Sequence, residues 1–122
     1  MLYELDIGDA TAGNLAAALR DLRAKEFGQT MSAYLVIEGT VRDQEALGRY
    51  APQAIPSLQP FGGEVIASAP WETLFGEPAY ANGMIVRFPD KDAALAWYNS
   101  PVYQALLGLR GAALNCRFRL VG

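Results

Sequence analysis

The residues of this sequence best suited to chemistry are an arginine and two tyrosines in its C-terminal third. Arg110 follows Tyr103 by seven positions and Leu107 by three, so on a helix it shares their apolar face. A guanidinium on such a face must be paired, because an unpaired buried charge is strongly destabilising. Its partner is either a ligand carboxylate or a structural one such as Glu38 or Glu64, and the sequence leaves both alternatives open.

Further aromatic side chains lie close to this segment. Trp97, Tyr98 and Tyr103 are candidates for the wall of a ligand pocket, where phenol groups would orient a small polar molecule. The competing interpretation makes them aromatic residues of the core or of an interface. Tyr50, on the apolar face of an earlier predicted helix, has the same two alternatives, since a buried phenol needs a hydrogen-bond partner in either role.

The sequence contains no histidine and one cysteine, Cys116. Catalytic triads that use histidine, histidine-ligated zinc and histidine-ligated haem are therefore impossible within it, and we expect no cofactor. Any proton transfer must use carboxylates, tyrosines, lysines or the thiol. A tyrosine ionises near pH ~10, so Tyr50 or Tyr98 would act as a hydrogen-bond donor or general acid rather than as a base.

The strands that must position these side chains are predicted from runs of aliphatic and β-branched residues. These runs cover residues 33–40, 64–69, 82–88 and 115–121. Helices are predicted between the first and second strands and between the third and fourth. The order from residue 33 is therefore β-α-β-β-α-β, which is the ferredoxin-like arrangement and belongs to the α+β class.

Local signals predict where the helices begin and end. Asp43 caps the first helix, and Pro52 and Pro56 are expected to kink or shorten it because they remove backbone donors. Asp90 caps the second helix. Ser100 and the proline after it end that helix and start another, which carries Tyr103 and Arg110.

A sheet of this kind has helices over one face only, so its other face must be wet or covered by a partner. Side chains alternate between the two faces along the first strand, with Leu35 and Ile37 on one face and Tyr34, Val36 and Glu38 on the other. Both faces therefore carry sizeable side chains. This pattern favours a homodimer in which two copies stack sheet on sheet.

Composition limits the remaining functions. The 122 residues suit one compact domain, and 52% of them are hydrophobic. The net charge is −3 and the arginines are scattered, so nucleic acid is not an expected partner. No apolar run approaches the ~20 residues of a membrane helix, and the start lacks a secretory pattern. With a single cysteine, these features predict a cytoplasmic protein that does not bind membranes.

A set of residues spread over positions 32 to 122 forms a recognisable combination: Tyr50, Gly62-Gly63, Phe88-Pro89, Trp97-Tyr98-Asn99-Ser100-Pro101, Tyr103 and Arg110. With this combination, residues from about 32 to 122 resemble an uncharacterised bacterial family catalogued as domain of unknown function 1330, within the dimeric α+β barrel superfamily. The resemblance implies a ferredoxin-like protomer that pairs into a barrel, with a small pocket between helices and sheet, and it supplies no established activity.

The first thirty residues have no counterpart in that family pattern. We therefore divide the chain into an N-terminal extension over residues 1–30 and a ferredoxin-like domain over residues 31–122. The extension is either an added strand–helix element, with Leu15, Leu19 and Leu22 on one helical face, or the product of an upstream start codon before Met31.

Three functions fit these observations. The first is a cofactor-free enzyme in which Arg110 holds a carboxylate or enolate and a tyrosine donates a proton; the resemblance adds only the fold-level analogy that its superfamily includes cofactor-free oxygenases and isomerases. The second is a binding module for a small organic acid or aromatic metabolite. The third is a purely structural homodimer. The partner of Arg110 distinguishes them, because a protein carboxylate there would remove the reason for ligand capture.

Overall fold

The fold is known from a computed structural model, which describes residues 32–122. The predicted extension over residues 1–30 lies outside the described residues, so both of its alternatives stay predictions. Within the described part the strands are β1 (Ala33–Val41), β2 (Glu64–Pro70), β3 (Asn82–Phe88) and β4 (Leu114–Val121). Each predicted strand is present, with ends that differ by at most one residue.

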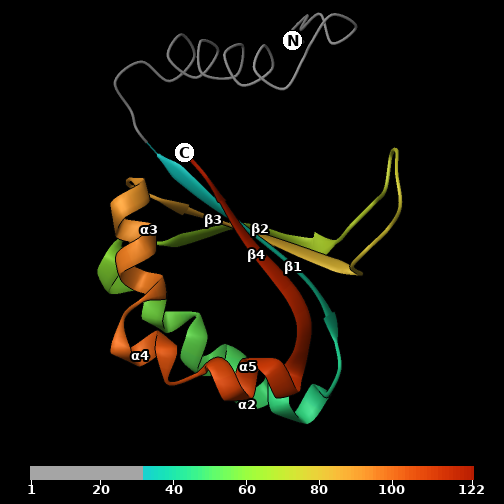
Figure 1. Ribbon diagram of the computed structural model, residues 1–122, viewed down its shortest axis with the longest axis horizontal. Helices are drawn as coiled ribbons and strands as arrows, with labels where there is room; N and C mark the ends of the chain where they lie inside the picture. Colours follow the sequence, from blue (N-terminus) through green and yellow to red (C-terminus); the bar gives the residue numbers. More distant parts are fainter. Residues whose placement is uncertain (1–31) are drawn as a thin grey trace, which may run out of the picture. The chain divides into compact units, whose positions relative to one another are not determined.

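The four strands form one antiparallel sheet in the order β2-β3-β1-β4 (Figure 1). The two central strands, β1 and β3, are not consecutive in the chain: β2 lies between them in the sequence and at one edge of the sheet. In the register, Leu35 of β1 lies opposite Val86 of β3 and Leu120 of β4, so all three point toward the same face. This strand order confirms the predicted ferredoxin-like arrangement.

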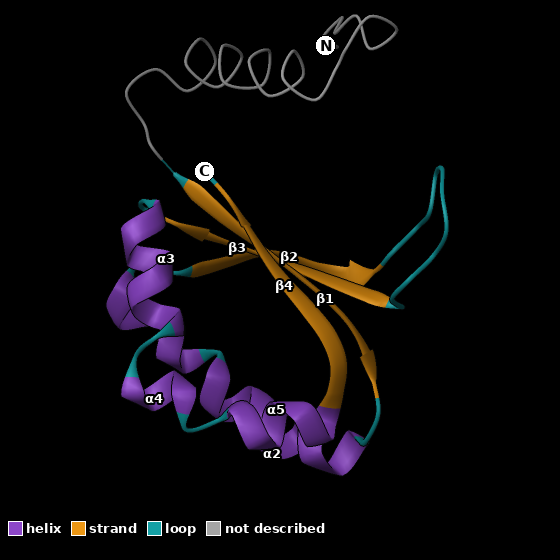
Figure 2. Cartoon of the chain, in the orientation of Figure 1, coloured by secondary structure: helices purple, strands orange, loops and turns teal. Residues whose placement is uncertain are grey.

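The helices of residues 32–122 all lie on one side of the sheet (Figure 2). Two of them, α2 and α5, lie side by side, and the backbone N–H of Arg42 donates to the carbonyl of Ala113 at 2.8 Å where they meet the sheet. Their bounds, with those of a 3₁₀ helix labelled η2, are α2 (Gln44–Ala54), η2 (Pro56–Phe61), α3 (Lys91–Tyr98), α4 (Pro101–Gln104) and α5 (Leu107–Ala113).

The predicted helix caps are confirmed. An Asp43 carboxylate oxygen accepts hydrogen bonds from the backbone N–H groups of Glu45 and Ala46, at 2.9 and 3.3 Å. Asp90 accepts from the N–H of Ala93 at 2.8 Å. These bonds satisfy donors that have no partner inside the helix.

Of the two prolines predicted to kink or shorten the first helix, Pro56 marks its end, whereas Pro52 lies inside α2 and does not end it. Its α-helical part ends at Ala54, and Pro56 starts the tighter 3₁₀ helix η2. Gly62 then ends η2 in the left-handed conformation, with φ of 77°. Next to it, a β-carbon on Gly63 would come within 2.9 Å of the Phe88 ring. Both glycines are therefore needed for the chain to turn tightly into β2.

The predicted helix after Ser100 is divided into α4 and α5, which differs from the single helix expected. Ser100 caps α4 by accepting from the N–H of Tyr103 at 3.2 Å. The N–H of Leu106 then bonds to the carbonyl of Tyr103, three residues back, at 2.9 Å. This tighter turn buries both Tyr103 and Leu106, and Gly108 lowers the helix propensity just beyond it.

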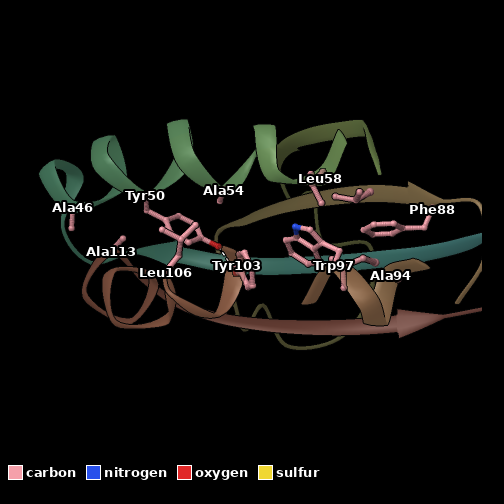
Figure 3. Close-up of a cluster of buried hydrophobic side chains, with 12 residues drawn as sticks. Ala46, Tyr50, Ala54, Leu58, Phe88, Ala94, Trp97, Tyr103, Leu106 and Ala113 are labelled. Atoms are coloured by element: carbon pink, nitrogen blue, oxygen red, sulfur yellow. Dashed lines mark hydrogen bonds between the residues drawn. The ribbon is translucent and has the colours of Figure 1, made fainter. Parts of the chain in front are cut away.

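The core lies between the sheet and the helices (Figure 3). Its largest fully buried side chains are Trp97, Tyr103, Phe88 and Val86. Aromatic rings thus fill the space beneath α3 and α4, where two of the predicted site residues lie. No helix within residues 32–122 is both long enough and apolar enough to span a bilayer.

The opposite face of the sheet, here called the open face, is covered by no helix of the described chain. Its charged side chains pair across strands: Glu38 accepts from Arg117 at 2.8 Å and from Arg119 at 3.3 Å, and Glu64 pairs with Arg87. Half-buried Val36 and Ile85 lie opposite each other between these pairs. The open face therefore combines apolar side chains with paired charges.

Candidate functional site

Arg110 is held among aromatic rings where α3, α4 and α5 meet strand β4. Its guanidinium carbon lies 4.8 Å from the centre of the Phe118 ring, 5.7 Å from that of Tyr98 and 5.9 Å from that of Tyr103. The side chain is half-buried. The electron-rich ring faces offset part of the cost of taking the cation out of water.

The hydrogen bonds of Arg110 leave most of its donors free. Its Nη1 donates to the hydroxyl of Tyr98 at 3.1 Å and to that of Tyr103 at 3.3 Å. Its Nε and Nη2 donors have no acceptor among residues 32–122, and no carboxylate of these residues lies within 4.0 Å. Arg110 is thus a partly buried cation without a counter-charge in the described chain.

The prediction that a carboxylate of the protein, such as Glu38 or Glu64, pairs with Arg110 is wrong within the described residues. Glu38 and Glu64, the two carboxylates considered, lie on the open face and pair with other arginines. Arg110 lies on the helix side of the sheet, so the sheet itself separates it from both of them. Side chains alternate along a strand, so Glu38 points to the open face while its neighbour Ile37 points to the helix side.

Tyr103 joins Arg110 to a second phenol. Its hydroxyl lies 2.5 Å from that of Tyr50, which hangs from α2 toward it (Figure 3). Burial raises the pKa of Tyr103 above its ordinary value, although its hydrogen bonds with Tyr50 and Arg110 oppose the shift. Burial also raises the pKa of Tyr50, and here the bond to Tyr103 adds to the effect. Both phenols are therefore neutral at physiological pH.

Arg110 and the Cys116 thiol near it also keep one protonation state. Burial lowers the pKa of Arg110, but hydrogen bonds to the Tyr103 and Tyr98 oxygens outweigh it and raise the pKa above the usual range. Burial raises the pKa of the Cys116 thiol, against the opposing effect of Arg110. The cluster thus holds one fixed positive charge beside neutral phenols and a neutral thiol.

Trp97 has its polar atom satisfied inside the protein. The indole Nε1 donates to the Ser57 hydroxyl at 2.9 Å, and that hydroxyl donates to the carbonyl of Ala54 at 2.5 Å, at the end of α2. The indole is 2% exposed and its ring centre lies 4.2 Å from that of Tyr103. Trp97 is a core residue that supports Tyr103, and its N–H is not free to orient a ligand.

A cavity of about 110 Å³ lies between α2 and the sheet. Tyr50 and Trp97 contribute to its wall, whereas Arg110, Tyr98 and Tyr103 do not. Its remaining lining is aliphatic or aromatic and comes from Ile37, Leu47, Ala51, Ala54, Ile55, Leu58, Met84, Leu114 and Phe118.

The structure therefore brings all five predicted site residues into one connected cluster. They divide into a hydrogen-bonded group of Arg110, Tyr98 and Tyr103, and a pair, Tyr50 and Trp97, that lines the cavity. Phe118, which lies under the guanidinium, was not among the predicted site residues, although its position on the apolar face of β4 was a usable signal. The role of Ser57 as the acceptor for Trp97 was not predicted, because no sequence motif around Ser57 indicates it. Within residues 32–122, no three His, Cys, Asp or Glu side chains gather as a metal would require.

The family comparison bears on the whole described region. The family model described as Domain of unknown function (DUF1330) matches residues 32–122. The chain belongs to this family. This confirms the resemblance drawn from the sequence, and the family carries no assigned activity. No curated protein matches the sequence.

Solved structures with the same fold include proteins with and without a described activity. A protein of unknown function from Rhodopseudomonas palustris is 20% identical, with a TM-score of 0.64 over 93% of this chain and 93% of its own. SnoaB from Streptomyces nogalater, a cofactor-independent oxygenase, is 12% identical, with a TM-score of 0.56 over 75% of this chain and 92% of its own. At these identities the likeness shows the fold alone.

Proposed function

We propose that the protein binds a small organic acid at Arg110 and Tyr98. The observation that carries this proposal is the half-buried guanidinium without a carboxylate partner within residues 32–122. A cation in such a place is stabilised when an anion joins it, because charge-assisted hydrogen bonds to a carboxylate are about twice as strong as neutral ones. The rings around it would exclude part of the water that otherwise weakens the pairing.

The free donors of Arg110 suit a carboxylate. Nε and Nη2 form one edge of the planar guanidinium, and an edge of this kind donates two parallel hydrogen bonds to the two oxygens of a carboxylate. The Tyr98 hydroxyl accepts from Nη1, which leaves its own proton for a ligand oxygen. Phe118 and Tyr98 would contact the apolar part of the acid.

The proposal is tested by thermal-shift titration with benzoate, pyruvate and acetate at millimolar concentration. We expect at least one of them to raise the melting temperature of the wild-type protein, and Arg110→Met to abolish that rise. Arg49→Met is the matched control, because Arg49 is exposed and pairs with Glu45, one helical turn away. If no carboxylate in a wider panel stabilises the wild-type protein, acid binding is not its function.

Binding without chemistry is better supported than acid–base catalysis. A proton-transfer enzyme needs a base as well as an acid. Around Arg110, the described residues supply neutral phenols and a neutral thiol, and no carboxylate or histidine. Catalysis remains the second candidate function, with Tyr98 as proton donor. The fold likeness to SnoaB favours it only by analogy, because a fold does not determine an activity.

We further propose that two copies pair through the open face. Val36 and Ile85 lie on it, and the exposed indole of Trp71 packs so closely over Gly83 that any side chain at position 83 would collide with it. A second sheet would cover these apolar groups, and cross-strand pairing already neutralises most of the neighbouring charge.

Sedimentation at micromolar concentration tests the pairing. We expect a wild-type dimer and a folded monomer for Val36→Lys, which would place an unpaired charge beside Arg119 in the interface. Val102→Lys is the control, since Val102 is 63% exposed on α4, on the helix side. A wild-type protein that sediments as a folded monomer would overturn the proposal.

A further inference from the structure

The cavity between α2 and the sheet differs chemically from the surroundings of Arg110. Its lining is aliphatic and aromatic throughout, and none of its residues is charged. The Tyr50 hydroxyl is engaged with Tyr103, and the Trp97 indole N–H with Ser57. The cavity therefore offers a ligand a shape and an apolar surface, and no free hydrogen-bonding group.

The cavity and Arg110 lie on either side of a shared wall. Phe118 lines the cavity and also lies under the guanidinium, while Tyr50 lines the cavity and bonds to the phenol that Arg110 contacts. Because Arg110 does not line the cavity, a small acid held by its guanidinium would not also fill the cavity. The two features are separate places for two kinds of molecule.

We infer that this cavity is a second binding site, one that takes a small uncharged molecule such as a simple aromatic ring. Enclosed apolar cavities of about 150 Å³ in other proteins bind benzene or xenon. This cavity is smaller, at about 110 Å³, and partly open to solvent, so a simple aromatic ring is the largest class of guest it suits and can enter it directly. A charged ligand is disfavoured there, because nothing in the lining would replace its lost hydration.

Two small side chains determine the space. Ala51 and Ala54 of α2 both face the cavity, and a larger aliphatic residue at either would fill it. In a well-packed core such a volume is normally occupied by side chains, since its lining otherwise loses dispersion contacts. The alanines thus keep open a space suited to a guest molecule. This inference goes beyond the acid site proposed above and does not depend on it.

The experiment measures benzene binding by calorimetry and by thermal shift. We expect the wild-type protein to bind benzene at millimolar concentration, and Ala51→Leu to weaken that binding about tenfold or more. Ala96→Leu is the matched control, because Ala96 is exposed on α3 and does not line the cavity. Leu47→Ala enlarges the cavity and should bind naphthalene about tenfold more tightly than the wild type does, which tests the site even if Ala51→Leu fails to fold.

The separate character of the site is tested with the acid-site variant. Arg110→Met should bind benzene as the wild type does, and benzoate should not compete with benzene. The inference is overturned if the wild type binds no benzene, if Ala51→Leu binds it unchanged, or if Arg110→Met or benzoate removes it. Benzene binding without any carboxylate binding would reject the acid site and leave the cavity site standing.

Discussion

At the scale of single residues, the position of Arg110 was predictable and its partner was not. Its spacing from Tyr103 and Leu107 was enough to put it on the buried side of a helix. Which carboxylates it could reach depended on the register of β1 against β4, which pairs Glu38 with Arg117 on the open face. Such pairing across 79 residues of chain leaves no local trace in the sequence.

The buried phenols make the free energy of unfolding depend on pH in the alkaline range. An unfolded tyrosine releases its proton near pH ~10, whereas burial raises the pKa of Tyr50 and Tyr103 in the folded state. Above that pH the folded protein binds more protons than the unfolded chain, so the free energy of unfolding falls as pH rises, by about 1.4 kcal/mol per unit for each phenol. Below pH ~9 both phenols are protonated in the folded and the unfolded state, so neither changes the free energy of unfolding with pH.

Urea unfolding between pH 8 and pH 11 measures this effect. Tyr103→Phe should reduce the alkaline slope, and its slope below pH ~9 should match that of the wild type. Equal alkaline slopes for the two proteins would show that Tyr103 titrates alike in the folded and unfolded states.

At the scale of elements, the beginnings and ends of helices were predicted well because their causes are local. Asp43, Asp90 and Ser100 each bond to a backbone N–H two or three residues away, and Pro56 acts on its own turn. The division between α4 and α5 was not predicted, since it depends on burying Leu106 against distant parts of the core.

Two glycine substitutions should have opposite effects on the free energy of unfolding, measured by urea denaturation. Gly48→Ala should stabilise the protein by about 0.5–1 kcal/mol, because position 48 lies in α2 with open space around it. Gly62→Ala should destabilise it by more than about 1 kcal/mol, since Gly62 has φ of 77° and an added β-carbon would come within 2.7 Å of Pro89. Equal effects at both positions would contradict the assigned role of Gly62 as the end of η2.

A cap removal tests the joint between α3 and α4. Ser100→Ala removes the oxygen that accepts from the Tyr103 N–H and donates to the Trp97 carbonyl. The expected loss is about 1–2 kcal/mol in the free energy of unfolding. Ser100→Thr keeps both hydrogen bonds and should recover most of it, whereas a threonine variant as weak as the alanine one would point to steric packing instead.

At the scale of the whole molecule, the strand order followed from the predicted element order, but the path of the connection between β2 and β3 did not. Residues 71–81 extend beyond the sheet as a hairpin loop (Figure 1). At its tip Leu74 and Phe75 are 90% and 98% exposed. Hydrophobic periodicity predicts helices and strands, but a loop has none, so the sequence does not indicate the direction in which the loop extends.

The tip of this loop should contribute to the proposed dimer. Replacing Leu74 and Phe75 together by Ser should leave the stability of the subunit unchanged, because the two side chains make almost no contact within it. In sedimentation, the same change should weaken dimerisation by about tenfold or more, because it removes two large apolar side chains that the partner would cover. Leu95→Ser, at a 42% exposed position on α3, is the control. Unchanged dimerisation in the double variant would leave the open face alone as the interface.

The two tryptophans of the chain give cavity binding and dimerisation each an optical reporter of its own. Trp97 is buried and lines the cavity, so its fluorescence should change when a guest binds there and should not change on dimerisation. Trp71 lies over Gly83 on the uncovered side of the sheet, so its emission should shift to the blue when two subunits meet. Replacing either indole by phenylalanine would leave the other signal intact, and one spectrometer could then follow occupancy and assembly separately in the same sample.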